Sequence, residues 1–371
     1  MKRIAVIMGK MHSGGKKNLV MEYYRHIDRN RFQFDFICDD DSNAIPDEEI
    51  AELGGRVYRV APYQKIWKHM ADLNRIFKEN KYEIMHAYDN LMNLFPLLIA
   101  KKHGVKVRIS ESISTGNKGE AQIVVKYALK PFAEVATNYL MANSTESAVF
   151  QFGQKTWDSG KVAMFKTVID AEGNAFNAEV RKAKREQMGW KDDEMILGFI
   201  GRFVAQKNPI FLMEIMGEIH KMEPKAKLVV VGHGPMEDKI KAKAEELGLG
   251  DSFCFVGKTE DIKPLYNAFD AFLLPSLYEG MPVVGVEAQC TGLPTIMADT
   301  ITTETTACSL AHYLPLGIGA KGWAEKVLEI VKENMPMRRS YAKEVIAAGF
   351  DSAYEAKRLE EYYDRALENE N

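Results

Sequence analysis

Short apolar runs alternate with longer amphipathic segments along this 371-residue chain. The runs are rich in β-branched and aromatic residues, and the segments between them place apolar residues at helical spacing, which is the pattern of a parallel, doubly wound sheet. In the first half the runs are 4–8, 32–38, 56–60, 83–86, 106–110 and 139–142, and in the second half they are 195–200, 227–231, 252–256, 271–274 and 294–297. The sequence therefore predicts an α/β protein with two Rossmann-like domains.

The two series are separated by a polar, irregular segment, 168–191. We place the domain boundary within it, so that residues 1–170 form one domain and residues 171–351 the other, both of ordinary domain size. The last segment, 352–371, sets Leu359, Tyr363 and Leu367 at helical spacing between charged residues. It is predicted to be a helix whose apolar side packs on a domain.

Composition supports an ordinary globular enzyme, because 46% of the residues are apolar, 27% are charged and no low-complexity tract is present. The apolar run 4–8 is too short for a signal peptide or a membrane span, so we expect a cytoplasmic protein. The four cysteines lie far apart, without the spacing of a metal or redox motif. Neither a zinc site nor a disulfide is expected.

Charge is unevenly distributed, since the net charge of -3 combines a basic first domain with an acidic second one. Part of the basic excess lies between two predicted helices, at Lys101, Lys102, Lys106, Arg108, Lys118, Lys126 and Lys130. Such a cluster is typical either of peripheral contact with the anionic inner face of a membrane or of an ordinary solvated surface. The sequence leaves both interpretations open.

A glycine loop follows the first apolar run. It reads Gly-Lys-Met-His-Ser-Gly-Gly over residues 9–15, and a helical pattern begins directly after Gly14 and Gly15. Glycines at a helix start let a phosphate approach the free N–H groups, although paired glycines are also ordinary turn chemistry. The spacing is not that of a dinucleotide-binding fold. His12 lies in the same loop and is a further candidate for contact with a ligand.

Two cations follow the first apolar run of the second domain. Arg202 and Lys207 are placed at the carboxyl end of a predicted strand, which is where open parallel sheets bind ligands. Two positive charges there would stabilise a diphosphate as negative charge develops on it. For either residue alone, a surface salt bridge is the alternative.

Two glutamates belong to a later strand, loop and helix, residues 271–290. Glu279 falls in a loop rich in glycine and proline, whereas Glu287 falls about one turn into an apolar helix that begins after Pro282. A carboxylate in such a helix needs a hydrogen-bond donor, and sugar or ribose hydroxyls would supply one. The proline at the helix start leaves N–H groups available to a phosphate.

Taken together, these residues resemble glycosyltransferase family 4 of the GT-B superfamily, particularly its members in bacterial capsule and exopolysaccharide assembly. The resemblance is strongest from about residue 196 to residue 303. The motifs that carry it are G-R-F-x-x-x-K-N at 201–208, V-G-H-G-P at 231–235, F-V-G at 255–257, the run 274–287 and G-L-P at 292–294.

The resemblance implies a GT-B fold, in which two Rossmann-like domains face a cleft, and a retaining hexosyltransferase. The donor would be a nucleotide diphosphate sugar, with UDP the most frequent nucleotide in the family, and the acceptor a glycan or a lipid-linked glycan. Neither a metal, a cofactor nor a nucleic acid is implied as a partner. The helix at about 352–371 would cross back onto the first domain, which would bind the acceptor, while the second would bind the donor.

The resemblance also assigns roles to residues. Arg202 and Lys207 would contact the diphosphate, Glu279 the donor sugar and Glu287 the ribose. The remaining donor-side candidates are Gly280, Met281, Pro282 and Val283 in the same loop, Lys258 beside the base, and Gly14 and Gly15 over the phosphates.

This sequence departs from the family on the acceptor side. Many relatives carry a histidine after the strand equivalent to 107–110, where this chain reads Arg-Ile-Ser-Glu-Ser-Ile-Ser-Thr over 108–115. A polar group in that loop would be Glu111 or a hydroxyl. His86 resembles a position common in the family, but a structural histidine is the competing interpretation. A second departure is Thr-Val-Ile-Asp at 167–170, where the family usually has Asn-Gly/Ala-Ile-Asp.

Two other functions are compatible with the sequence. A nucleotide-sugar epimerase shares this architecture, and a catalytically silent nucleotide-sugar-binding partner of another transferase would explain the missing histidine. Asp39, Asp40 and Asp41 are interpreted as a solvated acidic run after a strand, so no metal-binding motif is predicted.

Overall fold

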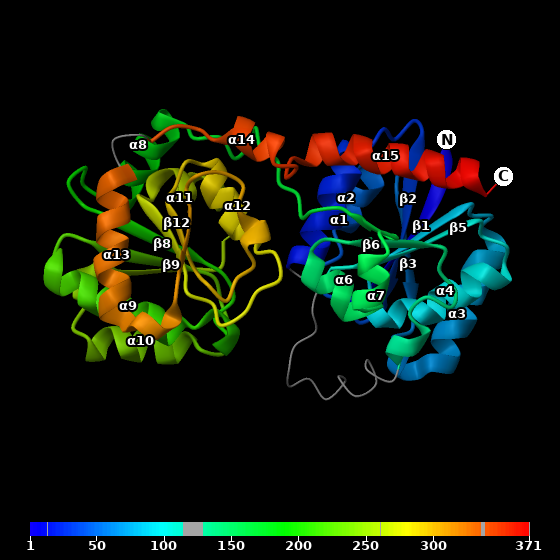
Figure 1. Ribbon diagram of the computed structural model, residues 1–371, viewed down its shortest axis with the longest axis horizontal. Coiled ribbons are helices and arrows are strands. Elements are labelled where there is room, and N and C mark those ends of the chain that lie inside the picture. Colours follow the sequence, from blue (N-terminus) through cyan, green and yellow to red (C-terminus); the bar gives the residue numbers. More distant parts are fainter. Residues whose placement is uncertain (13, 114–128, 260, 335–337, 371) are drawn as a thin grey trace. The chain divides into compact units, whose positions relative to one another are not determined.

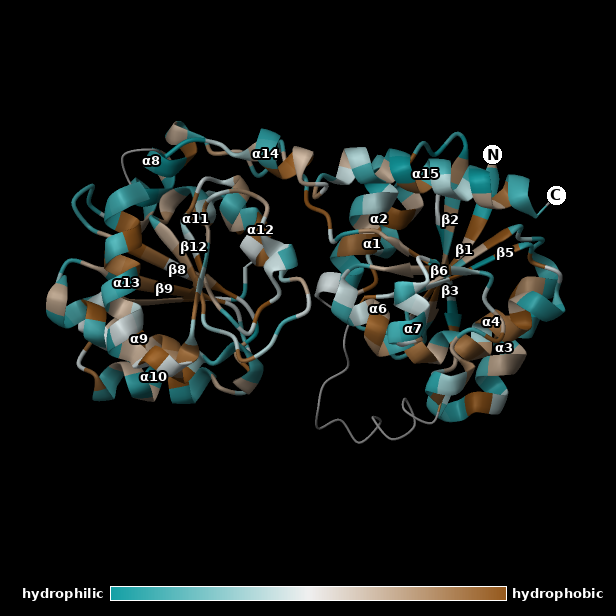
Figure 2. Cartoon of the chain, in the orientation of Figure 1, coloured by the Kyte–Doolittle hydropathy of each residue, from teal (hydrophilic) through white to brown (hydrophobic). Residues whose placement is uncertain are grey.

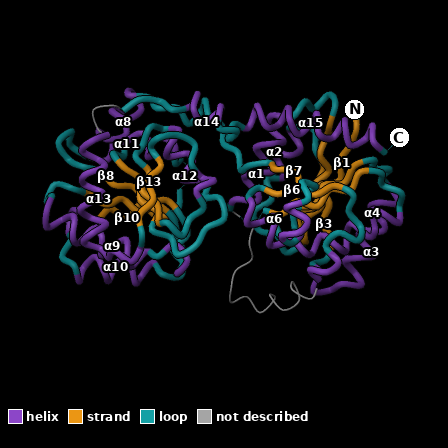
Figure 3. The backbone as a smooth tube through the Cα atoms, viewed as in Figure 1, coloured by secondary structure: helices purple, strands orange, loops and turns teal. Residues whose placement is uncertain are grey.

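The computed structural model describes residues 1–12, 14–113, 129–259, 261–334 and 338–370. Contacts divide the chain into two compact units. Unit 1 is Met1–Val168 with Ser352–Asn371, and unit 2 is Ile169–Asp351. Each unit is a parallel sheet with helices on both faces (Figures 1 and 3). The predicted α/β class with two doubly wound domains is confirmed, and the boundary expected after Asp170 lies close to the observed division.

The sheet of unit 1 is entirely parallel and has the order β3-β2-β1-β4-β5-β6-β7. Its strands are β1 (Lys2–Gly9), β2 (Phe32–Asp39), β3 (Arg56–Val60), β4 (Ile84–Ala87), β5 (Val107–Ser112), β6 (Tyr139–Ala142) and β7 (Val162–Met164). Its helices are α1 (Gly15–His26), α2 (Asp47–Glu52), α3 (Ile66–Glu79), α4 (Leu94–Lys102), α6 (Thr145–Phe152), α7 (Gln154–Asp158) and α15 (Ser352–Asn369), with short 3-10 turns η1 (Tyr63–Lys65), η2 (Asn90–Asn93) and η3 (Lys130–Phe132).

Helices cover both faces of this sheet, so most residues of its central strands are buried, and most of these buried residues are apolar (Figure 2). Alternate residues of β1 enter different cores, since Val6 belongs to the cluster that contains α1 and α15, and Ile7 to the one that contains α3 and α4. Leu359 and Tyr363 of α15 are buried in the first cluster. Arg31 fixes the same helix by an ion pair of 2.5 Å to Glu360.

Unit 2 repeats the architecture with the order β10-β9-β8-β11-β12-β13. Its strands are β8 (Ile196–Ile200), β9 (Lys227–Val231), β10 (Phe253–Gly257), β11 (Ala271–Leu274), β12 (Thr295–Ala298) and β13 (Ala311–Leu314). Its helices are α8 (Ala178–Met188), α9 (Pro209–Met222), α10 (Glu237–Glu246), α11 (Lys263–Ala268), α12 (Val283–Cys290), α13 (Gly319–Asn334) and α14 (Ala342–Ala347), with η4 (Ala205–Lys207), η5 (Gly250–Ser252), η6 (Thr303–Thr305) and η7 (Leu316–Ile318).

The prediction missed two strands, β7 and β13. Each lies at the edge of its sheet and is short, and most of its residues are only partly buried. Edge strands are less buried than central strands and need fewer apolar residues, so the apolar pattern that predicts a strand is weak in them. In both units the chain reverses its winding direction beside the first strand, between β1 and β4 and between β8 and β11. Ligands of doubly wound sheets bind at the carboxyl ends of the strands at such a point.

Candidate functional site

The loops after β8 and β9 meet at the carboxyl edge of the unit 2 sheet. The Gly201 N–H donates to the Val231 carbonyl at 3.0 Å, and the Phe203 N–H donates to the His233 carbonyl at 2.9 Å. Gly232 has φ +142°, and a Cβ there would lie 1.9 Å from the Gly201 oxygen. Only glycine permits this approach, which accounts for the glycine before His233 and fixes the loop that carries Arg202.

Lys207 and Glu279 come together at this edge. Lys207 ends η4 after β8, and Glu279 lies in the loop after β11, the neighbouring strand. The Lys207 ammonium is 2.6 Å from the Glu279 carboxylate, and the two side chains are only 14% and 10% exposed. The structure therefore places a cation and a carboxylate from separate motifs at one point, whereas Arg202, on the same edge, is exposed.

Gln206 ties these two loops to each other. Its backbone carbonyl accepts from the Leu277 N–H at 2.8 Å. Its side-chain amide donates to the Tyr278 carbonyl at 3.0 Å and lies 3.5 Å from Glu279. Sequence reasoning did not single out Gln206, because its role depends on the pairing of two loops.

Helix α12 starts beside Glu279. Pro282 precedes its first residue, Val283, and no side chain among the described residues caps this helix start. Gly280 and Met281 connect Glu279 to it. Uncapped N–H groups and the positive end of the helix dipole favour an anion at such a position.

Glu287 lies further along α12 and is partly exposed. The hydroxyl of Tyr266, a buried residue of α11, donates to its carboxylate at 2.8 Å. Burial, and next the Glu287 carboxylate, raise the pKa of Tyr266 well above its usual value, so the hydroxyl stays protonated and remains a donor. Glu287 thus has an internal partner, and it is still accessible from solvent.

Lys258 is the remaining donor-side candidate of unit 2. It follows Gly257, which ends β10 with φ +73°, and its side chain is exposed. Since all strands of the sheet are parallel, Lys258 lies on the same edge as Arg202, Lys207 and Glu279, on the far side of β9.

In unit 1 the glycine loop leads into α1, which begins at Gly15, and Gly14 has φ +150°. His12 is exposed, with Nδ1 2.8 Å from the Asn43 amide oxygen. Sequence reasoning missed Lys16 in the first turn of α1. Its ammonium contacts the Met8 carbonyl and lies 3.1 Å from Asp89.

Asp39 corrects one prediction. It ends β2 and is 2% exposed, so only Asp40 and Asp41 of the acidic run are solvated. Burial, and next the nearby Asp89, raise the pKa of Asp39 to about 7. Asp39 and Asp89 line a cavity of about 10 Å³, which is the size of a single water molecule. The signal that could have identified this pair is a carboxylate at the carboxyl end of each strand that flanks β1, namely Asp39 in β2 and Asp89 after β4.

His86 and Glu111 are buried against each other in unit 1. Their side chains are 0% and 1% exposed, and His86 Nε2 lies 2.8 Å from a Glu111 oxygen. The hydroxyls of Tyr363, on α15, and Tyr88 lie 2.8 and 3.1 Å from His86 Nδ1. This burial agrees with the interpretation of His86 as a structural histidine, and an acceptor-side role of either residue remains a prediction. The hydroxyls of Ser114 and Thr115 lie outside the described residues.

Comparison with known proteins places these features in a family. A sequence model described as "Glycosyl transferases group 1" matches residues 180–347. A Bacillus subtilis (strain 168) protein named as a glycosyltransferase, EpsF, is 30% identical over 382 residues, which cover 100% of this chain and 98% of that protein. The chain belongs to the group 1 glycosyltransferases. The resemblance to glycosyltransferase family 4 is thereby confirmed.

Two further relatives extend the comparison of this glycosyltransferase. The UDP-Gal:alpha-D-GlcNAc-diphosphoundecaprenol alpha-1,3-galactosyltransferase of Escherichia coli is 24% identical, over 77% of this chain and 76% of that enzyme. The crystal structure of Anabaena Alr3699/HepE in complex with UDP matches with a TM-score of 0.78 and 14% identity, over 98% of this chain and 100% of that one. The latter likeness shows the GT-B fold.

Proposed function

We propose that this glycosyltransferase is a retaining hexosyltransferase that moves a sugar from a UDP-sugar to a glycan or a lipid-linked acceptor in capsule or exopolysaccharide assembly. Unit 2 would bind the donor and unit 1 the acceptor. The observation that carries the proposal is the contact of 2.6 Å between Lys207 and Glu279 beside the uncapped start of α12. The names of the relatives support the donor and acceptor classes, since one is a UDP-galactose enzyme acting on a diphosphoundecaprenol acceptor and another is bound to UDP.

In the proposed reaction Lys207, Arg202 and the N–H groups at the start of α12 bind the diphosphate. As the bond between the sugar C1 and the diphosphate oxygen breaks, that oxygen takes the proton of the acceptor hydroxyl, which attacks C1 from the same face. Retention of configuration follows. Glu279 would lie at the donor sugar and Glu287 at the ribose, with Lys258, Gly14 and Gly15 as further donor contacts and His12 beside donor or acceptor.

No metal is required in this proposal, because the cations and the helix start would supply the positive charge that a divalent ion supplies in other transferases. Within the described residues no group of three or more histidine, cysteine, aspartate or glutamate side chains is arranged to hold a metal ion. The test is transfer in excess EDTA. Activity that disappears there and returns with magnesium or manganese would overturn this part of the proposal.

The donor is identified by a thermal-shift screen of nucleotide sugars, because a ligand at a hundredfold excess over its Kd stabilises the protein by roughly 2.7 kcal/mol. A UDP-sugar should give the largest shift, and its sugar should then appear on an acceptor. An epimerised nucleotide sugar formed without acceptor would favour the epimerase. Tight UDP binding without turnover over a broad acceptor panel would favour the silent partner.

Peripheral contact with an anionic membrane is part of the proposal. Trp67, near the start of α3, is 88% exposed and has the exposed Lys65 and Lys68 on either side. The neighbouring α4 exposes Leu98, Lys101 and Lys102. An aromatic ring among lysines suits a membrane interface that carries anionic lipid. Within the described residues, no helix combines the length and the apolarity needed to span a bilayer.

Vesicle flotation tests this contact. The wild type should float with phosphatidylglycerol vesicles and much less with phosphatidylcholine vesicles, and Trp67→Ser should lower the bound fraction. Ile318→Ser is the matched control, because it removes an exposed apolar side chain from unit 2. Equal flotation of the wild type and both variants would refute the contact.

A further inference from the structure

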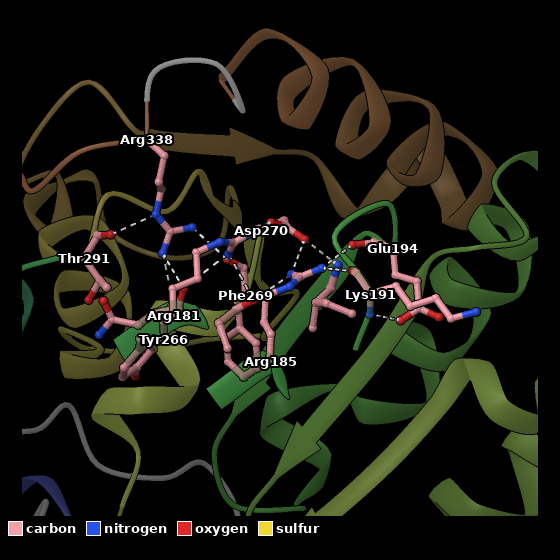
Figure 4. Close-up of polar contacts among 12 residues, drawn as sticks. Arg181, Arg185, Lys191, Glu194, Tyr266, Phe269, Asp270, Thr291 and Arg338 are labelled. Atoms are coloured by element: carbon pink, nitrogen blue, oxygen red, sulfur yellow. Dashed lines mark hydrogen bonds and ion pairs between the residues drawn. The ribbon is translucent and has the colours of Figure 1, made fainter. Parts of the chain in front are cut away.

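Three arginines converge at the amino edge of the unit 2 sheet (Figure 4). Arg181 and Arg185 come from α8, and Arg338 lies between α13 and α14. Asp270, directly before β11, lies 2.6 Å from Arg181 and 3.2 Å from Arg185. We call these four residues the arginine cluster. It contains three positive charges and one carboxylate.

The other hydrogen-bond partners of Arg181 and Arg338 are backbone carbonyls at the ends of two helices. Arg338 donates to the Phe269 carbonyl at 2.7 Å and the Tyr266 carbonyl at 3.0 Å, at the end of α11, and to the Thr291 carbonyl at 3.2 Å, at the end of α12 (Figure 4). Arg181 also donates to the Phe269 carbonyl, at 2.8 Å. A helix end carries roughly half a negative charge, so two helix ends and one carboxylate leave about one positive charge unbalanced.

The pKa of Arg338 reflects this excess. Burial, and next the neighbouring Arg181, lower the pKa of Arg338 to about 9; Arg185 acts in the same direction and Asp270 in the opposite one. Arg338 donates to the described residues through Nε, both hydrogens of Nη2 and one hydrogen of Nη1. Arg181 donates to them through both hydrogens of Nη1 and one hydrogen of Nη2. A guanidinium has five N–H groups, so within the described part of the chain both arginines have donors left for a further acceptor.

A cavity of about 180 Å³ lies beside these two guanidiniums. It is lined by Phe176, Arg181, Asp270, Pro294, Asn334 and Arg338. It is smaller than the roughly 300–1,000 Å³ of pockets that enclose a drug-sized ligand, so it suits a compact polar group. Asp270 and Pro294 precede β11 and β12, whereas Glu279 follows β11. The cavity therefore lies at the opposite edge of the sheet from Lys207 and Glu279.

We propose that this cavity is a second ligand site, which binds a phosphate group between Arg181 and Arg338. The paired N–H groups of arginine match the oxygens of phosphate, and the unbalanced charge favours a dianion. The phosphate is either free or carried by a metabolite whose remainder extends into solvent. The site is independent of donor binding at the carboxyl edge.

The experiment is a calorimetric titration of the full chain with inorganic phosphate in the presence of saturating UDP, at constant ionic strength. One phosphate should bind without displacing UDP. Arg181→Gln should weaken this binding by roughly tenfold, the value of one charge-assisted hydrogen bond. Arg339→Gln is the matched control, because Arg339 is the exposed neighbour of Arg338 and pairs with Glu344 instead.

A second variant distinguishes loss of the phosphate site from misfolding of the protein. Asn334→Asp places a negative charge on the lining of the cavity and leaves every arginine in place, so it should weaken phosphate binding while the Tm without phosphate stays close to that of the wild type. A titration with glucose 1-phosphate in place of phosphate separates the two ligand sources. Tighter binding of phosphate indicates a free phosphate as the ligand, and tighter binding of glucose 1-phosphate indicates a phosphate carried by a metabolite. Absence of phosphate binding to the wild type, or phosphate affinity in both Arg181→Gln and Asn334→Asp equal to that of the wild type, would overturn the proposal.

Discussion

Single and double variants can show whether the ion pair between Lys207 and Glu279 serves catalysis or only stabilises the fold. Lys207→Met removes the ammonium and leaves a carboxylate whose side chain is 10% exposed. Glu279→Gln leaves the ammonium without its charged partner. Breaking a buried ion pair costs about 3–5 kcal/mol, and the lower end applies here because both side chains are partly solvated.

The double variant, Lys207→Met with Glu279→Gln, should regain most of this stability, since no unpaired charge remains. It should not regain activity. If Lys207 binds the diphosphate and Glu279 the sugar, each single change lowers kcat/KM by roughly 2 to 4 kcal/mol, which is about 30- to 1,000-fold. The double variant should be at least as inactive as the worse single variant.

Urea unfolding and kcat/KM are measured on the same four proteins. Lys225→Met is the control, because the Lys225–Asp193 pair is exposed and its loss should change neither quantity by more than about 1 kcal/mol. A double variant that recovers activity together with stability would refute the assignment and leave the pair a structural one.

Four other changes separate roles within the two units. Glu287→Gln should weaken UDP binding by roughly ten- to a hundredfold in calorimetry, and Tyr266→Phe should weaken it in the same direction, because Tyr266 holds the Glu287 carboxylate. Unchanged affinity with a lowered Tm would make that pair structural. Gly232→Ala should destabilise unit 2 by at least roughly 1–3 kcal/mol in urea unfolding, since its Cβ meets the Gly201 oxygen at a positive φ; stability equal to the wild type would contradict this. The pKa of Asp39, about 7 in the folded chain, exceeds that of an unfolded aspartate, about 4, so the folded state loses stability as pH rises from about 4 to about 7. Asp39→Asn should therefore stabilise the protein more at about pH 8 than at about pH 5, and an equal effect at both would exclude a raised pKa.

The sequence predicted the fold well because a parallel sheet covered on both faces requires apolar runs, and those runs are conspicuous. It also placed Arg202, Lys207 and Glu279 at the carboxyl ends of strands, and the carboxyl ends of parallel strands lie at one edge of the sheet. The 2.6 Å contact between Lys207 and Glu279 was not predictable, because it depends on β8 and β11 being neighbours although β9 and β10 separate them along the chain.

The burial of Asp39 was not predicted, and neither was the contact between His86 and Glu111. His86 pairs across the sheet with Ile109, and Glu111 lies on the same face as Ile109 because side chains alternate along a strand. The meeting of His86 and Glu111 thus follows from strand register, which a single sequence does not reveal. The arginine cluster was missed for a related reason: Arg181 and Arg338 belong to no motif and meet only through the ends of α11 and α12.

The central claim is that the carboxyl edge of unit 2 binds a nucleotide diphosphate through protein cations rather than through a metal ion. Calorimetric titration of UDP in excess EDTA, into the wild type and Lys207→Met, tests it most directly. The account predicts that the wild type binds one UDP without metal and that Lys207→Met binds it at least roughly tenfold more weakly, as expected for the loss of a charge-assisted contact. UDP binding that requires magnesium or manganese, or that is equally tight in Lys207→Met, would contradict it.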